Sequence, residues 1–166
     1  MKWSGSAGDA IEQNAKSPWE LNTLGRILGI DFGSRRIGIS ISDPLQIIAQ
    51  SLTTIPHDRH AFSRIKEIVV REQVDLIVVG LPLNLKGEQG QKAQEVESFI
   101  GQLERHTNRE IVRWDERFTT SLAEDSLLVM GTKRKERRED KGRVDAMAAA
   151  IMLQGFLDSR KRSASC

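Results

Sequence analysis

The chain has 166 residues, 39% of them apolar, which is enough for one buried core, excludes a disulfide-stapled mini-protein and predicts a single domain. The net charge is +2, from 25 basic and 23 acidic residues, so attraction for an acidic partner depends on where the charges lie. A single cysteine, Cys166, excludes a disulfide within the chain, and no stretch approaches the roughly 18 apolar residues of a membrane span, so we expect a soluble cytoplasmic protein.

The chain order of the predicted elements is that of an α/β domain. Residues 1–25 are polar and lack helical periodicity, so we expect a loosely ordered leader outside the site. An apolar run at 26–30 and an alternation of β-branched with small residues at 37–41 predict two strands, which 47–55 extends into a meander. The later patterns predict, in order, a helix around 62–69, a strand at 75–80, a helix over 93–103, a strand at 110–114, a helix after the capping box Ser121 and Glu124, and a closing helix around 144–153. We therefore expect residues 26–159 to form a central mixed five-stranded sheet flanked by helices, with 160–166 as a flexible tail.

Three carboxylates lie where predicted elements begin or end. Asp31 follows the first strand, Glu116 stands just past the last strand, and Asp145 falls in the first turn of the closing helix. Each alone has a structural explanation, as a turn residue, a surface ion-pair partner or a favourable charge near a helix N-terminus. If they converge, they repel one another unless a cation neutralises them or a pKa rises. Oxygen ligands of this kind suit Mg²⁺ or Mn²⁺, and a pair of such ions can hydrolyse a phosphodiester bond.

Four sequence blocks carry a family resemblance. They are Ile30-Asp-Phe-Gly-Ser-Arg-Arg-Ile-Gly38, Val79-Gly-Leu-Pro-Leu-Asn84 with Gly87, Asp115-Glu-Arg-Phe-Thr-Thr120, and Val144-Asp-Ala-Met-Ala-Ala-Ala-Ile-Met-Leu153. In this order they resemble the bacterial pre-16S ribosomal RNA nuclease family, also called Holliday-junction-resolvase-like, from about residue 26 to 159. The resemblance implies a ribonuclease H-like fold. It also implies catalytic and metal-binding roles for Asp31, Glu116 and Asp145 around a divalent cation, Mg²⁺ or Mn²⁺.

Basic and polar residues near these blocks are candidates for holding a nucleic-acid backbone. The candidates are Arg35, Arg36, Asn84, Lys86, Lys133, Arg134, Lys135, Lys141 and Arg143. The first two follow Asp31, the next two follow a strand end where open α/β sites lie, and the others belong to a basic run before the closing helix. Each also has a simpler explanation as a solvated turn or loop residue. His57, His60 and His106 are expected to lie away from the blocks as structural or solvent-facing residues.

The predicted function is metal-dependent hydrolysis of phosphodiester bonds in a nucleic acid. The resemblance implies precursor 16S ribosomal RNA as the substrate, cleaved near its 5′ end. One alternative keeps the nuclease but changes the substrate to four-way DNA junctions. Another alternative is a non-catalytic module that binds nucleic acid or the ribosome. The carboxylates argue against the second alternative, because an acidic cluster repels phosphates.

Overall fold

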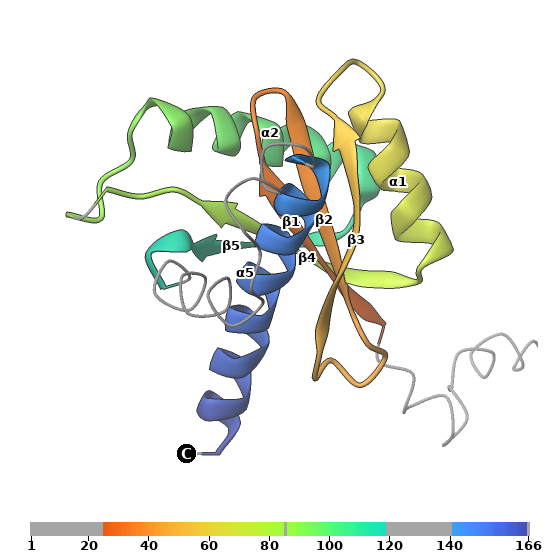
Figure 1. Ribbon diagram of the computed structural model, residues 1–166, viewed down its shortest axis with the longest axis vertical. Coiled ribbons are helices and arrows are strands. Elements are labelled where there is room, and N and C mark those ends of the chain that lie inside the picture. The colour runs from red at the N-terminus through yellow and green to blue at the C-terminus, as the bar shows by residue number, and fades with distance from the viewer. Residues whose placement is uncertain (1–24, 85, 119–140, 166) are drawn as a thin grey trace, which may run out of the picture.

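The computed structural model describes residues 25–84, 86–118 and 141–165. These residues form a five-stranded mixed sheet with the strand order β3-β2-β1-β4-β5 and helices on both faces (Figure 1). The predicted sheet is thus confirmed in strand number and in its mixed character. None of the helices in these residues has the length and apolar content to cross a membrane.

The first three strands form the predicted antiparallel meander. They are β1 (Arg26–Phe32), β2 (Arg36–Ser42) and β3 (Ala49–Pro56). The later strands are β4 (Val74–Leu81), which pairs with β1 in parallel, and β5 (Glu110–Asp115), which pairs with β4 in parallel. The carboxyl ends of β1, β4 and β5 therefore meet at one edge of the sheet, where open α/β folds hold their sites.

Two layers of helix cover the sheet. Helices α1 (Ala61–Arg71) and α2 (Gln91–Thr107) pack on one face, and α5 (Lys141–Ala164) crosses the other face (Figure 1). Strand β1 shows why both layers are needed, because its side chains alternate between two apolar cores. Leu28 and Ile30 join the core beneath α1 and α2, whereas Ile27 packs with Leu153 and Phe156 of α5. A strand buried on both faces reads as a continuous apolar run, which is the pattern of residues 26–30.

Small residues of β1 and β2 let α5 lie close to the sheet. In β2 the large residues face the core beneath α1 and α2, and the intervening Gly38 and Ser40 are buried in the strand. A β-carbon on Gly38 would lie 2.1 Å from the carbonyl oxygen of Asp145, and the Ser40 hydroxyl donates a 2.8 Å hydrogen bond to the carbonyl of Ala149. The alternation of branched and small residues at 37–41 therefore encodes a strand whose small residues form the surface on which this helix packs.

The ends of α5 differ from the sequence-based expectation. Within the described residues the helix begins at Lys141, so Asp145 stands in its second turn and not in its first. The macrodipole acts mainly within the first turn, so it does not explain this carboxylate. At the other end the helix continues to Ala164, into the segment predicted as a tail. There Arg160 donates a 3.0 Å hydrogen bond to the side chain of Gln46. The capping box at Ser121 lies outside the described residues.

Candidate active site

Asp31 and Glu116 come together across an intervening strand. Asp31 lies within β1, one residue before its end, and Glu116 begins the short 3₁₀-helix η2 (Glu116–Phe118) that directly follows β5. Strand β4 lies between β1 and β5 in the sheet. Its residue Gly80 lies beside Trp114 of β5, near the strand end that carries Glu116. A β-carbon on Gly80 would lie only 2.6 Å from Oε1 of Glu116. The absence of a side chain there gives the Glu116 carboxyl the space to reach Asp31, with which it shares a hydrogen bond.

The electrostatics of this pair favour a bound cation or proton. Burial raises the pKa of Asp31 from 3.8 to about 7, helped by the negative charges of Glu116 and Asp145 and by the hydrogen bond with Glu116. Burial is also the main cause that raises the pKa of Glu116. Two adjacent carboxyls repel one another when both are ionised, so this pair favours a bound proton or a bound cation over two uncompensated negative charges.

Asp145 stands beside this pair and is held by an arginine. The close approach of α5 over Gly38 brings Asp145 near enough to Asp31 for its charge to raise the pKa of Asp31. Its own carboxylate accepts a 2.9 Å hydrogen bond from Nε of Arg36, with which it forms an ion pair. The structure thus gathers three predicted carboxylates around one sheet edge and adds Arg36 from the turn after Asp31.

The donor set fits a divalent cation of the Mg²⁺ class. Carboxylate oxygens from Asp31 and Glu116 are adjacent, and Mg²⁺ commonly binds one or two protein carboxylates and keeps waters or phosphate oxygens at its other positions. In residues 25–84, 86–118 and 141–165, no three His, Cys, Asp or Glu side chains are grouped closely enough to form a metal site. The pair could offer two oxygen ligands to such a cation, whereas the Asp145 carboxylate is paired with Arg36.

The other predicted substrate-binding residues surround the carboxylates less closely. Arg35 is exposed in the β1–β2 turn, and its carbonyl accepts a 2.9 Å hydrogen bond from the backbone of His57. Asn84 and Lys86 are exposed in the β4–α2 loop. The Asn84 carboxamide oxygen accepts hydrogen bonds from the backbone N–H groups of Lys86 and Glu88, at 3.0 and 2.8 Å, so Asn84 shapes this loop.

The basic run before α5 is described only at its end. Arg143 is an exposed residue in the first turn of α5, and Lys141 is the residue at which the helix begins. Lys133, Arg134 and Lys135 lie outside the described residues, as does the side chain of Lys141. A role of this run in holding nucleic acid therefore stays a prediction.

One residue near the site, Lys92, was missed in the sequence. Lys92 stands in the first turn of α2, and its positive charge lowers the pKa of Asp31 and Glu116, opposing the effect of burial. Only the tertiary structure brings it near, since nothing in its local pattern distinguishes it from a solvated helix residue.

The expectation that His57 lies away from the four blocks is wrong. Its Nδ1 lies 3.1 Å from the carbonyl oxygen of Gly33, and its ring packs on Phe32 with a centroid distance of 5.0 Å. His57 follows β3 directly, and the meander returns this strand end to the β1–β2 turn, which explains the contact. His57 thus braces the turn that carries Arg35 and Arg36. His60 and His106 are exposed, as predicted.

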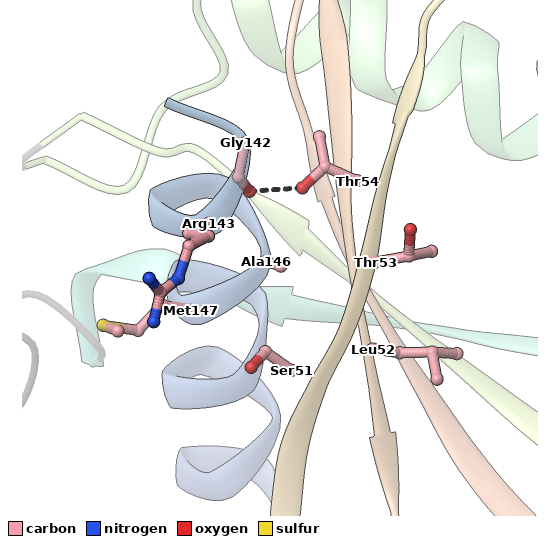
Figure 2. A pocket seen from close by; sticks show the side chains of 8 residues that line it. All are labelled: Ser51, Leu52, Thr53, Thr54, Gly142, Arg143, Ala146 and Met147. Atoms are coloured by element: carbon pink, nitrogen blue, oxygen red, sulfur yellow. Dashed lines mark hydrogen bonds between the residues drawn. The ribbon is translucent and has the colours of Figure 1, made fainter. Parts of the chain in front are cut away.

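A groove of about 390 Å³ lies on the side of α5 that faces β3 (Figure 2). It runs between the edge strand β3 and the first turns of α5, and its lining includes Ser51, Thr54, Arg143 and Met147. The Thr54 hydroxyl donates a hydrogen bond to the carbonyl of Gly142 and so ties the start of the helix to the strand. In Figure 2 the Ser51 hydroxyl points toward α5. Hydroxyl and guanidinium groups are common partners of phosphates, so this lining suits a nucleic-acid backbone.

Comparison with known proteins identifies the family. The family described as RuvX, Holliday junction resolvase, matches residues 25–159. The chain belongs to this family. It is 41% identical over 137 residues to a protein of Sulfurihydrogenibium named "Putative pre-16S rRNA nuclease", covering 81% of this chain and 91% of that protein. A protein of the same name from Clostridium botulinum is 44% identical over 136 residues, covering 81% and 97%. The predicted family and enzyme class, a nuclease, are thereby confirmed.

Solved structures confirm the ribonuclease H-like fold. RuvC of Thermus thermophilus in complex with a Holliday junction substrate superposes with a TM-score of 0.53 and 16% sequence identity, covering 83% of this chain and 96% of that chain. A second structure of Thermus thermophilus RuvC gives a TM-score of 0.51 at 15% identity, covering 82% and 96%. At such low identity the likeness concerns the fold, and the site must be argued from this chain's own residues.

Proposed function

We propose that this protein is a divalent-metal-dependent nuclease of the cytoplasm that cleaves precursor 16S ribosomal RNA near its 5′ end. The observation that carries the proposal is the carboxyl pair of Asp31 and Glu116, a half-buried site at the carboxyl edge of the sheet with raised pKa values. A purely structural role does not explain two acidic groups that share a hydrogen bond at such an electrostatic cost. The choice of precursor rRNA rests on the names of the relatives.

The proposed metal ligands are Asp31 and Glu116, with Asp145 as the third. When bound there, Mg²⁺ or Mn²⁺ would supply the chemistry of phosphodiester hydrolysis, by activating water and stabilising the leaving oxygen. The chain's own part is to hold the two carboxyls side by side, where burial raises their pKa values and a positive charge favours the ionised forms. Gly80 has no side chain to displace the Glu116 carboxyl. The positive charge of the exposed Lys92 lowers the pKa of both carboxyls and so favours their ionised forms.

The proposed substrate path follows the basic side chains around this edge. Arg35 and Arg36 project from the turn after Asp31, Lys86 lies in the β4–α2 loop, and Arg143 lines the groove beside β3. Guanidinium groups bind phosphate oxygens with two parallel hydrogen bonds, which suits a backbone-directed contact. The strand would thus cross the first turns of α5 between the carboxylates and the groove.

A four-way DNA junction is the second candidate substrate. The family description favours it, since the matching family is named for Holliday junction resolution. Both substrates require the same phosphodiester chemistry at the same carboxylates, so the alternatives differ in the nucleic acid and not in the site. A non-catalytic binding module is disfavoured, because a binder gains nothing from an acidic pair that repels phosphate.

The deciding experiment compares cleavage of a precursor 16S rRNA fragment and a four-way DNA junction side by side. Each is incubated with the full chain and Mg²⁺, Mn²⁺ or EDTA. We expect metal-dependent cleavage of the RNA, abolished by Asp31→Asn and by Glu116→Gln. The matched control is Glu110→Gln, an exposed residue of β5, which should cleave like the wild type. Faster cleavage of the junction would make four-way DNA the favoured substrate in place of precursor rRNA. Full activity of Asp31→Asn would refute the proposed site.

The basic run before α5 is tested by the salt dependence of binding. If it contacts the backbone, neutralising Lys133, Arg134 and Lys135 should flatten the log–log salt slope by about 0.7 per lost phosphate contact on single strands, or about 0.9 on duplex DNA. An unchanged slope would make this run an ordinary solvated loop.

A further inference from the structure

We propose that Arg36 is a positioning residue that holds Asp145 in the free protein and releases it to the metal when a nucleic-acid phosphate binds the guanidinium. The inference rests on the proposed function, because it assigns Asp145 as the third metal ligand. It adds a coupling between substrate and metal that the carboxylates alone do not have. Its basis is the position of one ion pair inside the candidate active site.

The ion pair is short but open to exchange. Nε of Arg36 lies 2.9 Å from Oδ2 of Asp145, and the two side chains are 42% and 32% exposed. A pair at this exposure is weak, since solvent screens it. Arginine does not lose its charge in proteins, and its guanidinium forms hydrogen bonds with phosphate as readily as with carboxylate. An incoming phosphate can therefore take the place of Asp145 on the guanidinium, and the Asp145 carboxylate is then free to bind a cation.

The backbones on both sides of the pair are fixed, which confines the exchange to side chains. The carbonyl of Asp145 packs directly on Gly38, where a β-carbon would lie only 2.1 Å away. The helix start is also tied to β3 by the hydrogen bond from Thr54 to Gly142. Arg36 begins β2 and is paired across to Pro56 in β3. Release of Asp145 thus requires a rotation of two side chains and no movement of α5.

The ion pair between Arg36 and Asp145 also changes the net charge that the site presents to a substrate. Asp145 already raises the pKa of Asp31 through its negative charge. Three uncompensated carboxylates would repel the phosphates of the substrate, whereas Arg36 neutralises one of them and presents a cation at the same edge. Once a phosphate takes the guanidinium, Asp145 becomes available as an oxygen ligand. Metal and nucleic acid should then each strengthen the binding of the other, as linkage requires.

The test measures Mn²⁺ binding to the full chain by calorimetry without nucleic acid. Variants are Arg36→Gln, Asp145→Asn and the double variant that carries both changes. We expect Arg36→Gln to bind Mn²⁺ about two- to fivefold more tightly than the wild type, the size expected for a half-exposed ion pair. In the Asp145→Asn background the same change should give no such gain. Arg36→Met, which keeps the apolar stem of the side chain, is the second variant should Arg36→Gln fail to fold.

Arg35→Gln is the matched control, because it removes the same charge from the same exposed turn. An equal gain in Arg35→Gln, or a gain that persists with Asp145→Asn, would show a general charge effect and overturn the inference. Unchanged Mn²⁺ affinity in both Arg36 variants would also overturn the inference. The proposed function would still stand in that case if the wild type cleaved RNA in a metal-dependent way. If Asp31→Asn bound Mn²⁺ as the wild type does, the proposed metal site itself would fail, and the inference with it.

Discussion

Replacing Asp31 with asparagine should stabilise the metal-free protein at pH 8. Asparagine has nearly the same shape and carries no charge, so it removes both the desolvation cost of the carboxylate and its repulsion with Glu116 and Asp145. The difference between a pKa of 3.8 and one of about 7 corresponds to about 4 kcal/mol. We expect about half of this to appear in the free energy of unfolding, because water and side-chain rearrangement screen the charge.

The sign of the pH dependence follows from proton binding. The native Asp31 keeps its proton up to about pH 7, whereas the unfolded residue loses it near 3.8, so the native state binds more protons between these values. The stability of the wild type relative to Asp31→Asn should therefore fall as the pH rises through this window. The two proteins should be about equally stable near pH 4 and differ most above pH 7.

Urea-induced unfolding, followed by circular dichroism in EDTA at several pH values, measures this difference. Glu110→Gln serves as the control, because Glu110 is exposed at the start of β5 and its change should leave the stability unaltered at every pH. Adding Mn²⁺ at pH 8 should stabilise the wild type more than Asp31→Asn, since the cation relieves the repulsion that asparagine lacks. A wild type as stable as Asp31→Asn at pH 8 in EDTA would refute the electrostatic reasoning.

Three further changes test how the site is positioned. Gly38→Ala should lower the free energy of unfolding by about 2 kcal/mol or more, because the new methyl group meets the backbone of α5. The control is Gly101→Ala, in open space within α2, which should raise the free energy of unfolding by about 0.5–1 kcal/mol in the same urea titration. Thr54→Val should cost about 1 kcal/mol through the lost hydrogen bond to the start of α5; equal stability would show that this bond does not hold the helix. Lys92→Gln should raise the pKa of Asp31 further and move the acidic limb of the pH–rate profile to higher pH; an unmoved profile would exclude Lys92 from the electrostatics of the site.

The sequence by itself determined the elements and the chemistry of the candidate residues. An apolar run at 26–30 marked β1 as a strand, and the alternation of β-branched with small residues at 37–41 marked β2 as another. These signals are local, because side-chain direction repeats every two residues in a strand and every 3.6 in a helix. The order of four blocks then indicated the family, and with it Asp31, Glu116 and Asp145.

The tertiary structure decided which of these residues meet. Glu116 reaches Asp31 across a glycine of an intervening strand, Arg36 pairs with Asp145 at a separation of 109 residues, and Lys92 acts on the carboxyls from another helix. The periodicity of a sequence encodes the face on which a side chain lies, but not the strand order, the register or the point at which a helix crosses the sheet. Those three quantities set every distance in the candidate active site, and the bracing of the β1–β2 turn by His57 was missed for the same reason.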